Sequence, residues 1–212
     1  MDNLVVILMK IGVLIFSVVV HEVAHGITAL KMGDATAKYA GRLTLNPLPH
    51  LDPFMSVILP AFLIATGAPF IVGGAKPVPV NPAYFRDHRK GTLAVSLAGP
   101  ASNILLAVLC AVLMIFAVKV EFITRNMPGI FVLLQYGVLI NVVLAVFNLM
   151  PIPPLDGSHV LMAFLPYEAA VKYSSIAPYG MIIILVMLML GFLQAILGPV
   201  FYVVNKLILM FI

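Results

Sequence analysis

Three ionisable side chains stand together in the sequence HEVAH, directly after a run of aliphatic residues. His21 and His25 are four positions apart, which places both imidazoles on one face of a helix, one turn from each other. Glu22 lies beside them and can reach the water of the same ion without being a ligand. Zinc hydrolases use this combination of residues to activate water. The spacing therefore predicts a catalytic zinc site with Glu22 as the general base.

A catalytic zinc ion needs a third protein ligand and one open position for water. Asp156, in the sequence PIPPLDG, is the best candidate, because it follows a spanning segment and a proline-rich turn. Proline cannot continue the helix and restricts the path of the chain, and Gly157 permits a tight turn. We therefore predict that Asp156 is the third ligand, with a helix N-cap as the alternative role.

The rest of the chain is too hydrophobic for a soluble domain. Hydrophobic residues make up 63% of the 212 residues and charged residues 9%, whereas soluble domains carry roughly 25% charged residues. We expect an integral membrane protein in which residues 1–212 form a single domain. The net charge of +4 comes from loop residues and indicates orientation in the membrane, so we expect a lipid bilayer as partner and no nucleic acid. Ionisable groups within a bilayer usually mark a functional site.

Apolar stretches of about 20 residues are long enough to cross a bilayer. The last apolar stretch, 178–212, is either one tilted helix or two pieces broken at Gly198 and Pro199. The second apolar stretch, 53–72, contains Pro60, Gly67 and Pro69, so we expect it to be re-entrant or kinked. The predicted fold class is an all-α polytopic membrane protein with about five to six transmembrane or re-entrant helices and a short membrane-associated β-hairpin. The apolar stretches are 4–30, 53–72, 92–118, 130–150 and 178–212.

The depth of the three candidate ligands restricts the topology. The HEVAH helix and the Asp156 turn can meet only if the first helix and the segment 130–150 end on the same side of the bilayer. A re-entrant stretch 53–72 meets this condition and brings the loops 31–50 and 73–90 together. These loops carry most of the basic residues. The positive-inside rule then predicts a multi-pass protein of the cell membrane with its active site toward the cytoplasm.

A membrane-spanning substrate has to unwind before it is hydrolysed, and the exposed strand needs a hydrogen-bonding partner. The segment 38–45, KYAGRLTL, has strand-forming residues around a glycine. We hypothesise that it is an edge strand that contacts substrate at Gly41 and Leu43, with a plain loop as the alternative. Asn103 and Asn141 are further candidates for substrate contact, although interhelical hydrogen bonding is an alternative role for Asn141.

Three motifs, in this order along the chain, resemble those of the site-2 proteases, which are intramembrane zinc metalloproteases. They are HEVAH, GPASN and NLMPIPPLDG, and the stretches GRLTLNPLPHLDP and KPVPVNP look like the small subgroup without PDZ or CBS domains. The resemblance implies one Zn²⁺ per chain on His21, His25 and Asp156, with Glu22 as general base. It implies that Asn148 helps to hold the substrate or the oxyanion. The implied reaction is hydrolysis of peptide bonds within or near transmembrane segments of membrane proteins.

Two other functions would use the same residues. A metal carrier or channel needs ligands along several helices and has no need of Glu22. A membrane hydrolase that acts on a prenyl or lipid group would use the same zinc chemistry. The substitution Glu22→Gln separates the first alternative from a protease, and substrate profiling separates the second.

Overall fold

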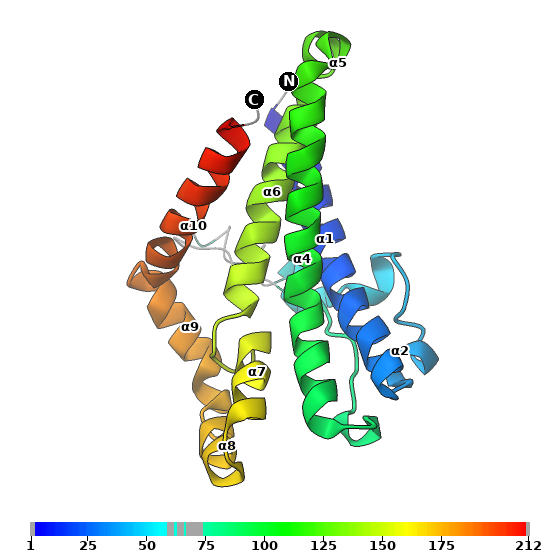
Figure 1. The fold of residues 1–212 in the computed structure, drawn as a ribbon, viewed down its shortest axis with the longest axis vertical. Helices are drawn as coiled ribbons and strands as arrows, with labels where there is room; N and C mark the ends of the chain where they lie inside the picture. The colour runs from blue at the N-terminus through cyan, green and yellow to red at the C-terminus, as the bar shows by residue number, and fades with distance from the viewer. Residues whose placement is uncertain (1–2, 59–61, 63–65, 67–73, 211–212) are drawn as a thin grey trace.

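The computed structural model describes residues 3–58, 62, 66 and 74–210, and helices are its regular elements (Figure 1). The long helices are α1 (Asn3–Met32), α4 (His88–Lys119), α6 (Pro128–Asn148), α9 (Gly180–Met189) and α10 (Phe192–Leu209). Shorter α-helices are α2 (Thr36–Tyr39), α5 (Glu121–Asn126), α7 (Asp156–Phe164) and α8 (Tyr167–Ser174). The remaining turns are η1 (Leu48–His50), η2 (Pro53–Ile58), η3 (Pro82–Tyr84) and η4 (Ala177–Tyr179).

Four stretches of the described chain are long and apolar enough to cross a membrane. A helix satisfies its own backbone hydrogen bonds, which is why such apolar segments are helical in lipid. Many large apolar side chains on these helices are exposed, as expected for surfaces that face lipid tails. The chain is therefore a multi-pass membrane protein. The stretches are Leu4–Met32, His88–Lys119, Gly129–Asn148 and Tyr167–Met189.

Helix α4 is the centre of the bundle and packs against α1, α6 and α7 (Figure 1). Helices α1 and α6 run in one direction and α4 runs in the other, so α1 ends near the beginning of α4, whereas the shorter α6 ends partway along it. Helix α7 lies against this part of α4. We call this end of the bundle, where α2, α7 and α8 also lie, the site end.

The predicted all-α class is confirmed for the described residues, but the predicted β-hairpin is wrong. The residues that the structure describes contain four candidate spanning helices and no strand. In the segment 38–45, helix α2 ends at a turn in which Gly41 has φ of +65°. The N–H of Gly41 donates to the Lys38 carbonyl and the N–H of Arg42 to the Ala37 carbonyl, both at 3.0 Å. This pair of bonds is a Schellman motif, so the glycine caps a helix.

The loops on either side of the stretch 53–72 lie together, as the parity argument requires. Most of that stretch itself, including the predicted re-entrant turn, lies outside the described residues. The N–H of Arg86 donates to the Met32 carbonyl (3.0 Å), and the N–H of Lys76 donates to the His50 carbonyl (2.8 Å). The buried Asp34 carboxylate accepts from the Asn81 N–H (2.7 Å). These bonds join the two loops at the site end.

The last apolar stretch is broken, but not at Gly198 and Pro199. Helix α9 ends at Met189, and Gly191, with φ of +72°, separates it from α10. A left-handed glycine just past a helix end is a common stop signal. Pro199 lies inside α10, where it removes one backbone donor without ending the helix. The predicted break point is therefore wrong.

Candidate active site

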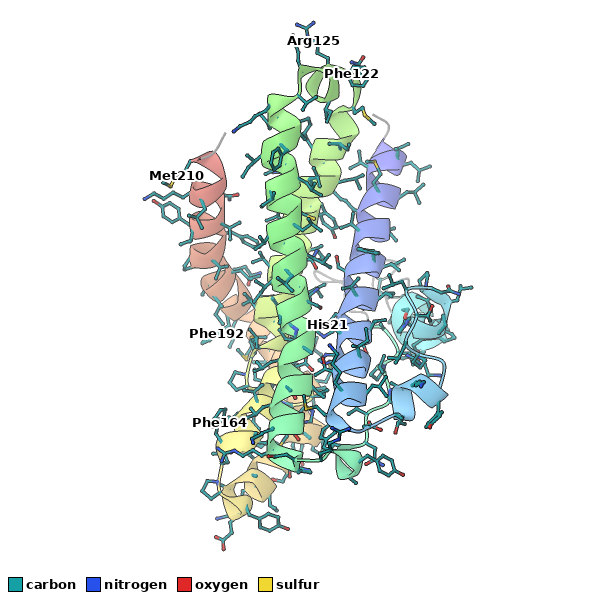
Figure 2. All side chains as sticks on the ribbon, turned by 45° about the vertical axis from the view of Figure 1, so that its right-hand side comes forward. His21, Phe122, Arg125, Phe164, Phe192 and Met210 are labelled. Carbon is teal, nitrogen blue, oxygen red and sulfur yellow. The ribbon has the colours of Figure 1, made fainter. Side chains whose placement is uncertain are left out.

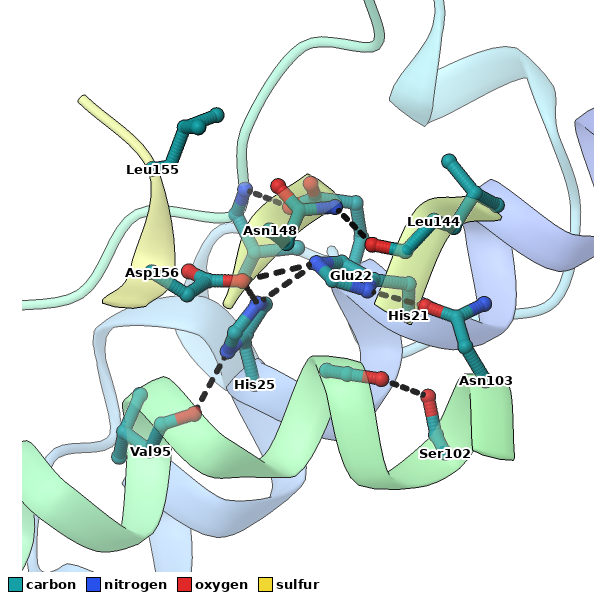
Figure 3. A network of polar contacts seen from close by, with 12 residues as sticks. His21, Glu22, His25, Val95, Ser102, Asn103, Leu144, Asn148, Leu155 and Asp156 are labelled. Atoms are coloured by element: carbon teal, nitrogen blue, oxygen red, sulfur yellow. Dashed lines mark hydrogen bonds and ion pairs between the residues drawn. The ribbon is translucent and has the colours of Figure 1, made fainter. Parts of the chain in front are cut away.

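The three predicted metal ligands meet at the site end of the bundle (Figure 3). His21 Nε2 lies 3.2 Å from Asp156 Oδ2, and His25 Nε2 lies 3.3 Å from the same oxygen. The two Nε2 atoms are 3.0 Å apart. Helix α1 supplies both imidazoles and the first residue of α7 supplies the carboxylate. His21 lies well inside the bundle, between Arg125 near one end and Phe164 toward the other (Figure 2).

Each imidazole is oriented by a hydrogen bond from its other nitrogen. His25 Nδ1 donates to the Val95 carbonyl of α4 at 2.7 Å. His21 Nδ1 lies 2.6 Å from Asn103 Oδ1, which accepts because the amide nitrogen of Asn103 donates to Asn141. With the proton of each neutral ring on Nδ1, both Nε2 lone pairs point toward Asp156. Such partners fix the tautomer and orientation of metal-binding histidines.

The donor set fits a zinc ion. Two lone pairs and a carboxylate oxygen repel one another at these distances unless a cation lies among them. Among the described residues, Asp156 Oδ2 is buried and has no hydrogen-bond partner. In tetrahedral coordination with bonds of about 2.0–2.1 Å, ligand atoms lie roughly 3.3 Å apart, close to the distances between these three atoms. The arrangement leaves room for an ion bound by His21, His25 and Asp156.

Gly99 of α4 lies directly against the two imidazoles. A Cβ built on Gly99 would come within 2.6 Å of His21 Nε2 and closer still to His25 Nε2. Any larger residue would therefore displace the ligands. The motif GPASN carried this signal, since it places Gly99 one turn before Asn103, the partner of His21.

Asn103 and Asn141 belong to a buried polar network behind His21. Asn103 Nδ2 donates to Asn141 Oδ1 (2.8 Å), and Asn141 Nδ2 donates to Ser17 Oγ (2.9 Å). Each of the three side chains is no more than 1% exposed. The network joins α1, α4 and α6 and ends at the Nδ1 atom of His21. These contacts give both asparagines a structural role, and their contact with substrate stays a prediction.

The turn before α7 is built so that Asp156 faces the imidazoles. Gly157 packs against the backbone at the end of α6, where an added Cβ would lie 2.6 Å from the Met150 carbonyl oxygen and still closer to that of Leu149. Ser158 Oγ donates to the Leu155 carbonyl (2.7 Å) and is fully buried. A residue with a side chain at position 157 would push α7 away from α6. The glycine therefore fixes the depth of the carboxylate.

A cavity of about 350 Å³ opens beside the three ligands and is lined by Glu22 and Asn148, among others. Glu22 Oε2 accepts a hydrogen bond from the Val78 N–H (2.7 Å). Its other oxygen, Oε1, accepts no hydrogen bond from the described residues. Asn148 Nδ2 donates to the Leu144 carbonyl of its own helix (3.0 Å). Both predicted catalytic residues therefore lie at the cavity that adjoins the ligands.

The other two predicted substrate contacts lie elsewhere. Gly41 is in the turn after α2, and the end of the Leu43 side chain packs against Gly26 of α1. Neither is among the described residues that line the cavity. A contact between substrate and these two residues stays a prediction.

Comparison with known proteins places the chain in a family. The family model described as "Peptidase family M50" matches residues 120–191, which include Asn148 and Asp156. A Bacillus subtilis protein named "Putative zinc metalloprotease YwhC" is 39% identical over 176 residues, which are 82% of this chain and 77% of the relative. No solved structure matches the chain.

Two mycobacterial proteins named "Putative zinc metalloprotease Rip2" are also similar. The protein of Mycolicibacterium smegmatis is 32% identical over 82% of this chain and 64% of its own length. The protein of Mycobacterium tuberculosis strain H37Rv is 32% identical over 86% of this chain and 67% of its own length. The chain therefore belongs to peptidase family M50 and is a zinc metalloprotease of the site-2 protease type.

Proposed function

We propose that this protein hydrolyses peptide bonds within or near the transmembrane segments of membrane-protein substrates. One Zn²⁺ per chain is held by His21, His25 and Asp156, and residues 1–212 act as a single catalytic domain. The observation that carries the proposal is the convergence of these three ligand atoms, within 4.8 Å of one another, beside a cavity lined by Glu22. When bound, zinc supplies Lewis-acid activation of water and of the scissile carbonyl.

Glu22 is the general base of this proposal. It lies next to His21 on α1 but outside the ligand set, so its carboxylate is available for proton transfer. The Val78 N–H holds Oε2, which leaves Oε1 to take a proton from water. The same carboxyl group then donates that proton to the leaving amine. Glutamate at this position therefore moves protons, and the two histidines hold the metal.

Asn148 positions the substrate at the edge of the cavity. One hydrogen of its amide nitrogen donates to the Leu144 carbonyl, so the second N–H and the oxygen Oδ1 are available to a substrate. Oδ1 accepts a backbone N–H from an unwound peptide, and the second N–H donates to the oxyanion.

The active site faces the cytoplasmic side of the cell membrane in this proposal. The site end holds most of the basic residues, which the positive-inside rule assigns to the cytoplasm. Those at the site end are Lys31, Lys38, Arg42, Lys76, Arg86, Arg89, Lys90 and Lys172, and those toward the other end are Lys10, Lys119, Arg125 and Lys206.

The proposed function is tested by cleavage of a model transmembrane peptide in detergent. The purified wild-type protein should cleave the peptide, a zinc chelator should stop cleavage, and added zinc should restore it. The variant Glu22→Gln should bind as much zinc as the wild type and cleave nothing. Equal zinc binding is expected because Glu22 is outside the ligand set.

The same experiment separates the alternatives. Cleavage by Glu22→Gln at the wild-type rate would exclude Glu22 as the base. A wild-type protein that binds zinc but transports it into vesicles without cleaving any peptide would be a carrier. Cleavage of lipid-modified peptides only at the lipid linkage, with no break in the peptide chain, would identify a hydrolase of another kind.

A further inference from the structure

Arg42 is a buried cation with no described role in the reaction, and we propose that it positions the general base. Its side chain lies on the loop after α2 and is part of a residue that is only 7% exposed. It acts through residues 74–81, an extended segment that we call the strap. This inference rests on the proposed function, since it requires Glu22 to be the base.

The Arg42 guanidinium donates to the backbone of the strap. Its Nη2 lies 2.6 Å from the Lys76 carbonyl oxygen and 3.3 Å from the Pro77 carbonyl oxygen. No carboxylate forms a salt bridge with Arg42 in the described part of the chain. Burial of a charged side chain is costly unless its donors are hydrogen-bonded. The bonds to the strap are therefore the contacts that compensate for the burial of Arg42.

The same peptide group connects Arg42 to Glu22. The Pro77 carbonyl and the Val78 N–H belong to one peptide bond, which is planar and trans, so its oxygen and hydrogen point in opposite directions. Arg42 holds the oxygen, and Glu22 Oε2 accepts the hydrogen at 2.7 Å. A donor on the carbonyl also polarises the peptide and strengthens its N–H as a donor. Arg42 therefore fixes the group that orients the base.

The strap is also seated on the helix that carries the base. Gly26 lies four residues after Glu22 and on the same face of α1. A Cβ on Gly26 would lie 3.1 Å from Val78 Cγ1, so the missing side chain lets Val78 sit against the helix. The N–H of Val78 therefore contacts Glu22, and its side chain contacts α1 one helical turn later, at Gly26. With Arg42 on the other side, the peptide group is held from both directions.

The geometry predicts a specific kinetic effect for Arg42→Ala. Loss of a partner that orients an active-site group commonly costs 10–100-fold, so kcat should fall by roughly that factor. The KM for the model peptide and the zinc content should stay at the wild-type values, since no ligand is touched. Arg42→Lys retains a donor and should recover part of the lost kcat. Lys38→Ala removes an exposed cation four residues away and should leave kcat unchanged.

A double-mutant cycle tests whether Arg42 acts through the Val78 amide. Val78→Pro removes the N–H that Glu22 accepts, and its kcat should fall as in Arg42→Ala. Val78→Ala keeps the N–H and should retain a higher kcat than Val78→Pro. The double variant Arg42→Ala/Val78→Pro should be no slower than either single variant, because groups on one pathway are not additive.

Three results would overturn the inference while leaving the proposed function intact. These are a wild-type kcat in Arg42→Ala, a fully additive double variant, or a loss of activity in Arg42→Ala that is matched by loss of zinc and of folded protein. In each case the wild type remains active and Glu22→Gln inactive. Failure of the proposed function is recognised separately, because then the wild type cleaves nothing or Glu22→Gln cleaves equally well.

Discussion

Gly99 has no side chain, and the two imidazoles occupy the space that one would take. Glycine in a helix normally costs about 0.5–1 kcal/mol relative to alanine, so Gly99→Ala improves the helix propensity of α4. We nevertheless expect this variant to bind less zinc and to lose proteolysis, since the new Cβ lies against both Nε2 atoms. Zinc per chain, measured on folded protein after size-exclusion chromatography, checks the prediction.

Gly12→Ala provides the matched control for this experiment. Gly12 is also within a spanning helix, and among the described residues no atom outside its own stretch of helix backbone lies within 4 Å of a Cβ built there. This variant should keep wild-type zinc content and activity. If Gly99→Ala also kept its zinc, the ion could not lie where the three ligand atoms converge.

Asn103 holds His21 in place, so its removal should weaken the metal site without removing a ligand. Asn103→Ala leaves His21 Nδ1 and the Asn141 amide without their partner. Loss of such an outer partner typically reduces metal affinity 10–100-fold. A competition titration with a zinc chelator should show this reduction. Asn126→Ala, on the exposed helix α5, should leave the affinity unchanged.

At the scale of elements, the connection between α1 and the strap depends on the carboxylate of Asp34. Burial alone would raise the pKa of Asp34, but hydrogen bonds from Thr36 and the Asn81 N–H outweigh it, so the pKa lies below the ordinary value of 3.8. A group whose pKa is lowered in the folded state stabilises the protein at pH values above its ordinary pKa. This contribution disappears as the pH falls through the lowered pKa.

Asp34→Asn should therefore lower the unfolding temperature in detergent at neutral pH, by an amount equivalent to about 2 kcal/mol for hydrogen bonds to a charged group. The difference from the wild type should shrink as the pH falls below 3.8. Glu168→Gln, an exposed carboxylate change on α8, serves as the control and should have no such effect. A constant difference at all pH values would exclude the ionised carboxylate as its source.

The sequence predicted the long helices and the proximity of His21, His25 and Asp156 more successfully than the connections. Spanning helices follow from local hydrophobicity, and HEVAH follows from helical spacing within α1. The turn at Gly41 was misread because a glycine among strand-forming residues is equally compatible with a hairpin and with a helix cap. The places of Gly99 and Arg42 depend on contacts between segments far apart in the chain, which local patterns do not contain.

At the scale of the whole molecule, the two ends of the bundle should be accessible from opposite sides of the membrane. In a Cys110→Ala background, Tyr39→Cys on α2 and Tyr167→Cys on α8 should react with an impermeant maleimide from the cytoplasmic side. Arg125→Cys on α5 should react from the other side, because α5 lies at the opposite end of α4 (Figure 2). Reaction of Tyr39→Cys and Tyr167→Cys from different sides would contradict the fold.

The three ligand atoms come from α1, near the start of the chain, and from α7, in its final third. During synthesis, the histidines are inserted into the bilayer long before the aspartate leaves the ribosome. A half-made chain therefore has an incomplete ligand set and no means of cutting its neighbours. The complete ligand set therefore exists only after residue 156 has joined the two histidines.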